Sequence, residues 1–236
     1  MTPPLLLLTR PRAQSGRFAE RCRSECPPHR VLIAPLTEIV PLTFDASVFE
    51  GAGAVILTSP NAVAAVRGLG LPAWCVGPGT AAAARAAGLV VRESGGDAAH
   101  LLADLRRAGP QERLVHACGR HLARDLVAAL APEGFDIRAV MVYEARALPW
   151  PDGVLPALES AAHVLAPLFS PRAAEEFALR LGGFVPQGLR IVAISANCAD
   201  RLPAALRARC TLAASPDAAA MRREIKEGLS HSPPEP

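Results

Sequence analysis

Several short turns in this chain carry groups that bind anions. The turns are rich in serine, threonine, asparagine, glycine and arginine, and a helix-forming stretch follows each of them. The first N–H groups of a helix have no partner within the helix and carry its positive dipole end, so such turns hold carboxylates or phosphates. The candidates for binding an anionic ligand are Arg10, Thr58, Ser59, Asn61, Gly79, Thr80, Gly96, Gly119, Arg120, Ser170, Ser195 and Asn197. For any turn taken alone an alternative stays open, because serine, threonine and asparagine are common N-caps and proline favours the first helical position.

Candidates for acid–base or covalent chemistry are few. The sequence has no serine nucleophile elbow, no His–Glu zinc helix and no Walker phosphate loop. Its six histidines show no paired spacing, and we expect His116 to be a strand residue. Tyr143 is the single tyrosine and lies in a segment that alternates apolar and polar residues. On physical grounds it either faces a ligand or is a packing residue whose hydroxyl bonds locally.

Two patterns suggest a cofactor or a metal, and neither is specific. Gly77-x-Gly79-x-x-Ala82 fits a dinucleotide-binding fingerprint, but Glu93 comes early for a ribose ligand and the equivalent turn at Ser195 has no glycine. Cys22 and Cys26 are four residues apart, yet no second pair stands at metal-ligand spacing. The sequence therefore predicts no metal and no organic cofactor.

Composition excludes several classes of partner. The net charge of +3 is small and the basic residues are scattered, which argues against nucleic acid binding. No apolar run approaches the roughly 20 residues that span a bilayer, and the apolar start is too short for a secretion signal. We therefore expect a cytoplasmic protein that does not bind membranes, with its six cysteines reduced.

The chain is built from two matching halves. Residues 58–62 (Thr-Ser-Pro-Asn-Ala) match residues 169–173 (Phe-Ser-Pro-Arg-Ala), and residues 94–99 match residues 214–219. Short apolar runs alternate with helical stretches, which is typical of buried parallel strands covered by helices. The predicted fold class is α/β, with two similar flavodoxin-like parallel-sheet lobes. Ligands of such sheets bind beyond the carboxyl ends of the strands, where the turns lie.

Two segments interrupt this pattern and predict a connector between the lobes. They are residues 37–43 and 141–147, which alternate apolar and polar residues beside prolines. Each lobe is then discontinuous, and the chain crosses from one lobe to the other once and back once. The expected boundaries are 1–36 plus 148–229 for lobe 1, 44–140 for lobe 2, and 230–236 for a disordered tail.

Taken together, these turns resemble the uroporphyrinogen-III synthase family over the chain from Leu5 to about Ile225. The matching stretches are Leu-Leu-Thr-Arg-Pro at 7–11, Leu-Thr-Ser-Pro-Asn-Ala-Val at 57–63, Val-Gly-Pro-Gly-Thr-Ala at 76–81, Val-Tyr-Glu at 142–144 and Phe-Ser-Pro-Arg-Ala at 169–173. The sequence departs from the pattern at 195–198, where some members have a Gly-Pro-Thr-Thr turn, so the roles of Ser195 and Asn197 are in doubt.

The resemblance implies a lyase of tetrapyrrole biosynthesis that needs no cofactor. Its substrate would be the linear tetrapyrrole hydroxymethylbilane, which loses water and closes to uroporphyrinogen III with ring D inverted through a spiro intermediate. Tyr143 matches the tyrosine proposed to assist departure of the hydroxyl, and Arg10 matches a turn position common in bacterial members. The hydroxyl groups that match the family's cleft are those of Thr58, Ser59, Thr80 and Ser170.

The resemblance also implies a monomer with substrate held between its lobes, and transient contact with the preceding enzyme of the pathway is a further expectation. Two alternatives from other classes stay open at this point. One is a two-lobed sensor that binds a small anion without turnover, and the other is a nucleotide-dependent oxidoreductase.

Overall fold

The computed structural model describes residues 2–95, 97–109, 112–122 and 124–230, which form two α/β units. Unit 1 comprises Met1–Glu38 and Ala147–Pro236, and unit 2 comprises Ile39–Arg146. The chain therefore leaves unit 1 once and returns to it once.

Unit 1 contains a five-stranded parallel sheet in the order β2-β1-β9-β10-β11. Its strands are β1 (Leu5–Leu8), β2 (Arg30–Ile33), β9 (Val164–Leu168), β10 (Leu189–Ala193) and β11 (Cys210–Leu212). Counted along the chain of this unit, the order is 2-1-3-4-5, which is that of flavodoxin-like folds. The predicted parallel α/β sheet is confirmed.

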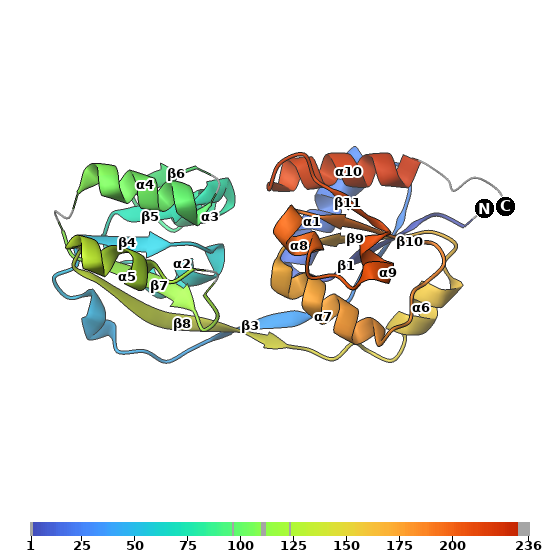
Figure 1. Ribbon diagram of the computed structural model, residues 1–236, viewed down its shortest axis with the longest axis horizontal. Coiled ribbons are helices and arrows are strands. Elements are labelled where there is room, and N and C mark those ends of the chain that lie inside the picture. The colour runs from blue at the N-terminus through green and yellow to red at the C-terminus, as the bar shows by residue number, and fades with distance from the viewer. Residues whose placement is uncertain (1, 96, 110–111, 123, 231–236) are drawn as a thin grey trace. The chain divides into compact units, whose positions relative to one another are not determined.

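Helices cover both faces of this sheet, which explains the four consecutive leucines of β1. Successive side chains of a strand point to opposite faces. Leu5 and Leu7 belong to the core with α6 (Val154–Ser160), α7 (Pro171–Leu181), α8 (Ala196–Ala199) and α9 (Ala204–Arg207). Leu6 and Leu8 pack with α1 (Arg12–Glu25) and α10 (Ala218–Ser230), and Figure 1 shows α10 and α7 on opposite sides of the sheet. Each fully buried leucine contributes about 1.5–3 kcal/mol.

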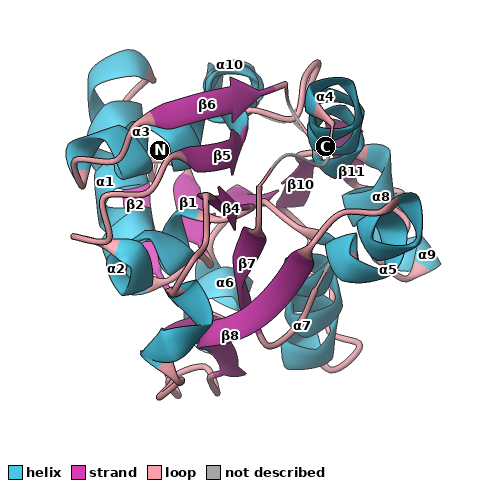
Figure 2. Cartoon of the chain, turned by 90° about the vertical axis from the view of Figure 1, so that its left-hand side faces the viewer, coloured by secondary structure: helices cyan, strands magenta, loops and turns pink. Residues whose placement is uncertain are grey.

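Unit 2 contains a six-stranded sheet in the order β3-β8-β7-β4-β5-β6. Its strands are β3 (Thr37–Pro41), β4 (Ala54–Leu57), β5 (Ala73–Val76), β6 (Val91–Ser94), β7 (Leu114–Gly119) and β8 (Ile137–Ala147). The pairings from β8 through to β6 are all parallel. Figure 2 shows these strands as a twisted row with helices on both sides.

Two helical layers sandwich the unit 2 sheet. Val55 and Leu57 of β4 pack with the 3₁₀ turns Ala46–Phe49 and Pro60–Ala62, α2 (Val63–Val66) and α3 (Gly77–Ala86). Ala54 and Ile56 face α4 (Ala98–Ala108) and α5 (Leu126–Leu130). The 3₁₀ turn Ala131–Glu133 follows α5. Figure 2 shows α2 and α3 on one side and α4 and α5 on the other.

The two sheets have the same arrangement once the halves of the chain are exchanged. Unit 1 reads β2-β1-β9-β10-β11, and unit 2 reads β8-β7-β4-β5-β6. The pair β1–β2 thus corresponds to β7–β8, and β9–β10–β11 corresponds to β4–β5–β6. Of the five strands that the two arrangements share, each unit takes two from one half of the chain and three from the other, and β3 is an additional strand of unit 2. The topology supports the duplication that the matching turns indicate.

The strands β3 and β8 form the two-stranded connection between the units. Leu42 N donates to Val142 O at 3.0 Å, and Leu148 N donates to Leu36 O at 2.8 Å, which is the register of an antiparallel pair. β8 begins at Ile137, before the predicted 141–147, because its first residues also pair with β7. β3 is assigned to Thr37–Pro41, and the hydrogen bond of Leu42 extends its pairing with β8 by one residue.

Two further differences from the predicted elements concern chain ends and turns. The last helix, α10, includes Ser230, where we expected a disordered tail, and residues 231–236 lie outside the described residues. The turn at Arg120 does not open directly into a helix. The next helix described is α5, whose first turn is capped by Asp125 through a 3.0 Å hydrogen bond from Ala128 N.

Candidate functional site

The carboxyl-terminal edge of the unit 2 sheet gathers candidate residues from three neighbouring strands. Thr58 follows β4, Gly119 ends β7, and Tyr143 on β8 stands opposite Gly119 in the strand register. The register between β7 and β8 shifts between Cys118 and Gly119, so that one residue of β8 bulges out. Such a bulge re-aims the side chain that follows it, and that side chain is Tyr143.

The phenol ring of Tyr143 lies directly against the backbone of Gly119. A Cβ atom at position 119 would stand 2.7 Å from Cζ and 2.9 Å from the hydroxyl oxygen of Tyr143. These distances are too short for any side chain, so a glycine is required for the phenol to take this position. Tyr143 is half-buried, which leaves part of the ring accessible to a ligand.

Arg120 is tied to the same strand through two contacts. Its backbone N–H donates to Tyr143 O at 3.0 Å, and its side-chain Nε donates to Glu144 Oε2 at 3.2 Å. Both charged side chains are partly exposed, and exposed pairs of this kind contribute at most about 1 kcal/mol. The guanidinium can therefore exchange this carboxylate for one on a ligand at small cost.

The site also contains a residue that the sequence reasoning did not select. His116 on β7 is 1% exposed, and its Nε2 lies 3.2 Å from Thr58 Oγ1. Burial lowers the pKa of His116 to about 4, and the charge of Asp125 opposes this shift. The sequence does mark His116, because it interrupts the apolar strand 114–118. Its contact with Thr58 could not be predicted, because it depends on the register between β4 and β7.

The other candidates in unit 2 differ in accessibility. Ser59 accepts a hydrogen bond from Asn61 N at 3.2 Å and caps the 3₁₀ turn that precedes α2. Gly79 is exposed in the first turn of α3, whereas Thr80 is only 4% exposed, and so its hydroxyl is less accessible than the predicted cleft-lining role needs. Gly96 lies outside the described residues.

At the carboxyl-terminal edge of the unit 1 sheet, Arg10 follows β1 and lies on an aromatic ring. Its Cζ is 4.4 Å from the ring centroid of Phe169, which follows the neighbouring strand β9. Burial, and next the nearby Arg17, lower the pKa of Arg10 from its ordinary value. Arginine remains charged at neutral pH all the same, so this edge presents a fixed cation.

Two capping serines follow the strands β9 and β10 of unit 1. Ser170 accepts from Ala173 N at 3.1 Å at the start of α7, and Ser195 accepts from Cys198 N at 3.4 Å at the start of α8. Cys198 Sγ donates to Ser170 O at 3.2 Å and so links the two turns. Asn197 is exposed in α8, a helix of only four residues with a correspondingly small dipole. A capping serine still has its own O–H to donate to a ligand.

The buried cysteines are poor nucleophiles. Burial raises the pKa of Cys198 to about 11, that of Cys75 to about 11 and that of Cys22 to about 12, so these thiols are protonated at neutral pH. All six cysteines are free. Within the described ranges, no three histidine, cysteine, aspartate or glutamate side chains cluster as metal ligands.

The dinucleotide-binding alternative receives no support from Glu93. Its Oε2 lies 2.9 Å from Arg85 Nη2, so the carboxylate that would bind a ribose is already paired with a guanidinium. Both side chains are partly exposed.

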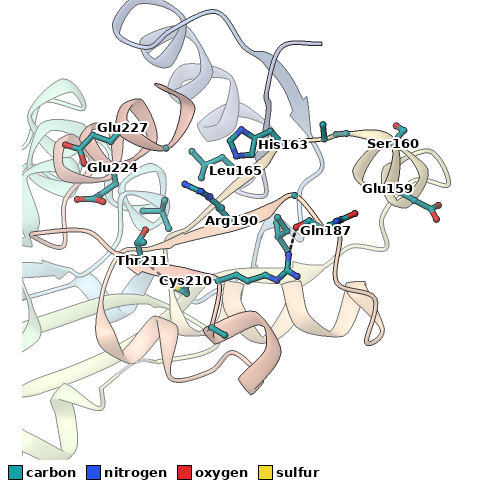
Figure 3. A pocket seen from close by; sticks show the side chains of 18 residues that line it. Glu159, Ser160, His163, Leu165, Gln187, Arg190, Cys210, Thr211, Glu224 and Glu227 are labelled. Atoms are coloured by element: carbon teal, nitrogen blue, oxygen red, sulfur yellow. Dashed lines mark hydrogen bonds between the residues drawn. The ribbon is translucent and has the colours of Figure 1, made fainter. Parts of the chain in front are cut away.

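A further hollow lies away from these turns. A cavity of about 1030 Å³ opens at the amino-terminal ends of β9, β10 and β11 in unit 1, and no described candidate residue lines it. Figure 3 shows Arg190 and His163 on one side of it and Glu224 and Glu227 of α10 on another. The size of this cavity and the positions of the predicted turns thus point to opposite ends of the strands as the ligand site. We favour the turns, because ligands of parallel α/β sheets bind at the carboxyl ends of the strands.

Comparison with known proteins identifies relatives of the whole chain. The family model described as "Uroporphyrinogen-III synthase HemD" matches residues 17–222. The uroporphyrinogen-III synthetase of Helicobacter pylori is similar in structure, with a TM-score of 0.65 and 15% identity, over 94% of this chain and 98% of the other. A mutant uroporphyrinogen III synthase of Thermus thermophilus gives a TM-score of 0.56 at 19% identity, over 96% and 99%. A sequence search of curated proteins finds no match. Of the helices described, none is long and apolar enough to cross a membrane.

Proposed function

Because the chain belongs to the uroporphyrinogen-III synthase family, whose members are lyases of tetrapyrrole biosynthesis, we propose that Tyr143 is its catalytic acid. The single observation that carries this proposal is the contact of the Tyr143 ring with Gly119, which sets a phenol at the carboxyl-terminal edge of the unit 2 sheet. The flanking hydroxyl and guanidinium groups then bind the carboxylates of the substrate.

The proposed reaction begins with loss of water from hydroxymethylbilane. The Tyr143 hydroxyl gives its proton to the departing hydroxyl group, the C–O bond breaks with both electrons on oxygen, and the adjacent pyrrole supplies the electron pair that forms an azafulvene. Ring D then attacks the azafulvene carbon through its substituted α-carbon and forms the spiro intermediate. The bond from that α-carbon to the methylene shared with ring C breaks, and the methylene bonds instead to the free α-carbon of ring D, which inverts the ring. The proton that this carbon loses restores the Tyr143 hydroxyl. A general acid of this type contributes roughly 10²–10⁴-fold in rate.

The proposed substrate contacts are hydrogen bonds to carboxylates. Ionised carboxylates accept hydrogen bonds only. Ser59, Ser170 and Ser195 each keep an O–H for such a ligand, because each serine oxygen accepts a backbone N–H. Thr58 is half-exposed and adds a fourth hydroxyl. Arg10 and Arg120 add charge at the same edges. We propose that backbone or amide groups also bind the substrate, from Asn61, Gly79, Gly96, Gly119 and Asn197. The hydroxyl of Thr80 contributes least to substrate binding, because Thr80 is buried.

The experiment supplies the purified protein with freshly prepared hydroxymethylbilane and separates the oxidised product isomers. Without enzyme the azafulvene closes without inverting ring D, so the type III isomer reports enzyme-directed closure. We expect type III product to predominate. Type I product alone, formed at the rate of a protein-free control, would rule out the proposed function. Binding of the tetrapyrrole without turnover would instead favour an anion sensor.

Two finer properties complete the proposal. We propose a cytoplasmic protein, supported by six free cysteines, which are typical of reducing compartments. We also propose that it acts as a monomer and contacts the preceding enzyme only transiently. Sedimentation of the protein at working concentration tests whether it is a monomer, and a stable dimer would contradict this proposal.

A further inference from the structure

A buried histidine of the unit 2 core, His116, makes a polar contact with Thr58 of the proposed site. His116 shares the sheet face of Ala54, Ile56 and Leu114, which pack against α4 and α5. Thr58 extends the same face by two residues, and the atoms Nε2 and Oγ1 are 3.2 Å apart. His116 is buried while Thr58 is half-exposed, so the pair connects the interior of unit 2 with its ligand-binding edge.

His116 is neutral at physiological pH, because burial lowers its pKa to about 4. A neutral imidazole carries one N–H and one bare nitrogen. Its second nitrogen, Nδ1, is buried and has no hydrogen-bond partner among the described residues. If the single proton is on Nδ1, the core contains an unpaired N–H donor; if it is on Nε2, the core contains an unpaired acceptor nitrogen.

The alternatives are not equal in cost. A proton on Nδ1 would leave a buried N–H donor unpaired, and orphaned buried donors are rarer in proteins than under-satisfied acceptors. A proton on Nε2 leaves only a bare nitrogen without a partner and allows the N–H to point at Thr58. The second arrangement is favoured.

We infer that His116 is a positioning residue that donates from Nε2–H to Thr58 Oγ1 and thereby directs the Thr58 O–H towards a substrate carboxylate. The oxygen of Thr58 is then engaged as an acceptor, so its hydrogen is left for a ligand that only accepts. This is the hydrogen-bonding character of an ionised carboxylate. The inference rests on the proposed function, because it assumes that a carboxylate of the tetrapyrrole binds at this edge.

The tautomer is tested without activity, by NMR of the ¹⁵N-labelled protein. Long-range ¹H–¹⁵N correlations of the His116 ring, assigned by comparison with His116→Gln, distinguish a protonated from a bare nitrogen. We expect the protonated type at Nε2 and the bare type at Nδ1 at neutral pH. A protonated Nδ1 overturns the inference whatever the enzyme does.

Kinetics test the role of the contact. His116→Leu removes the donor and keeps the core apolar, and we expect KM to rise roughly 3- to 10-fold with kcat little changed. His116→Gln places an amide N–H at similar reach and should restore most of the affinity. His163→Gln is the matched control, because His163 precedes β9 at the amino-terminal end of the unit 1 sheet. A KM that does not change in His116→Leu overturns the inference.

A double-mutant cycle with Thr58→Val separates a shared contact from two independent ones. If His116 acts through Thr58, His116→Leu adds little to the KM of Thr58→Val. Effects that multiply overturn the inference. Failure of the proposed function is distinguishable, because the wild-type protein would then give no type III product. The carboxylate role would fall in that case, and NMR would still decide the tautomer.

Discussion

The two units share one sheet arrangement but place different residues at its ligand-binding edge. Aligning Ser59 with Ser170 through the common Ser-Pro turn places Phe169 where unit 2 has Thr58. The parallel registers then bring Leu8 of β1 to the place of His116. A hydrogen-bonded polar pair in one unit thus corresponds to an apolar pair in the other.

The difference extends to the groups that cover each pair. Phe169 and Phe18 form an edge-to-face pair with ring centroids 5.1 Å apart, and the Arg10 guanidinium lies over the Phe169 ring. In unit 2 the edge carries the Tyr143 ring over Gly119. Unit 1 therefore presents a fixed cation, and unit 2 presents a phenol and an oriented hydroxyl. Duplication supplies the turn, and the strand-end residues decide what chemistry the turn can support.

The hydroxyl of Tyr143 should have the strongest influence on the rate. Tyr143→Phe keeps the ring that packs on Gly119 and removes only the hydroxyl, so we expect kcat to fall by roughly 10²–10⁴-fold while the fold is kept. Single-turnover assays with hydroxymethylbilane measure the rate, and circular dichroism checks the fold. Wild-type turnover would leave Tyr143 as a packing residue and remove the functional contrast between the units.

The next effect concerns stability and pH, and the part of it that His116 causes should appear in unit 2. The pKa of His116 is lowered from 6.5 to about 4 in the folded protein, so between these values the unfolded chain binds a proton that the native state does not. Stability therefore falls as the pH falls through this window, by up to about 3 kcal/mol at its lower end. Leu8, at the corresponding place in unit 1, does not titrate.

The two tryptophans allow each unit to be followed separately, because Trp74 lies on β5 of unit 2 and Trp150 lies in unit 1. Denaturant unfolding of Trp150→Phe therefore reports unit 2, and Trp74→Phe reports unit 1. We expect the pH dependence of unit 2 to flatten in His116→Leu. The same slope with and without His116 would show that other groups cause it.

A smaller effect concerns the space that Tyr143 needs. Gly119→Ala places a methyl group 2.7 Å from Cζ of Tyr143, so the ring must move, and we expect kcat to fall by roughly 10- to 100-fold. In the Tyr143→Phe background the same change should have little further effect on kcat. Gly16→Ala is the matched control, because a Cβ at position 16 in α1 would meet no atom within 4 Å. Equal losses in both backgrounds would contradict the positioning role.

Sequence patterns predicted the parts of the fold that depend on local signals. The four leucines of β1 indicate a strand buried on both faces, and the Ser-Pro turns at 59 and 170 indicate helix starts, which the capping hydrogen bonds confirm. The expectation that a helix follows the turn at Arg120 directly was wrong, because the next helix described begins after Asp125, which caps it.

The contacts of the candidate site were beyond sequence reasoning for a physical reason. Thr58 and His116 are 58 residues apart and meet only through the register of β4 and β7. The approach of Tyr143 to Gly119 depends on a one-residue bulge in β8, which no local pattern marks. The burial of Thr80 likewise follows from how α3 packs on the sheet.

The Ser-Pro turn that the two units share should have a weaker influence, on stability alone. Ser170 caps the 11-residue helix α7, whereas Ser59 caps a three-residue 3₁₀ turn. Ser170→Ala should therefore cost about 1 kcal/mol of unfolding free energy, a typical N-cap value, and Ser59→Ala should cost less, because fewer helical hydrogen bonds depend on it. The single-tryptophan backgrounds measure each change in its own unit. Equal losses of unfolding free energy would contradict this expectation. The length of the capped helix would then have no influence on how much each serine stabilises its unit.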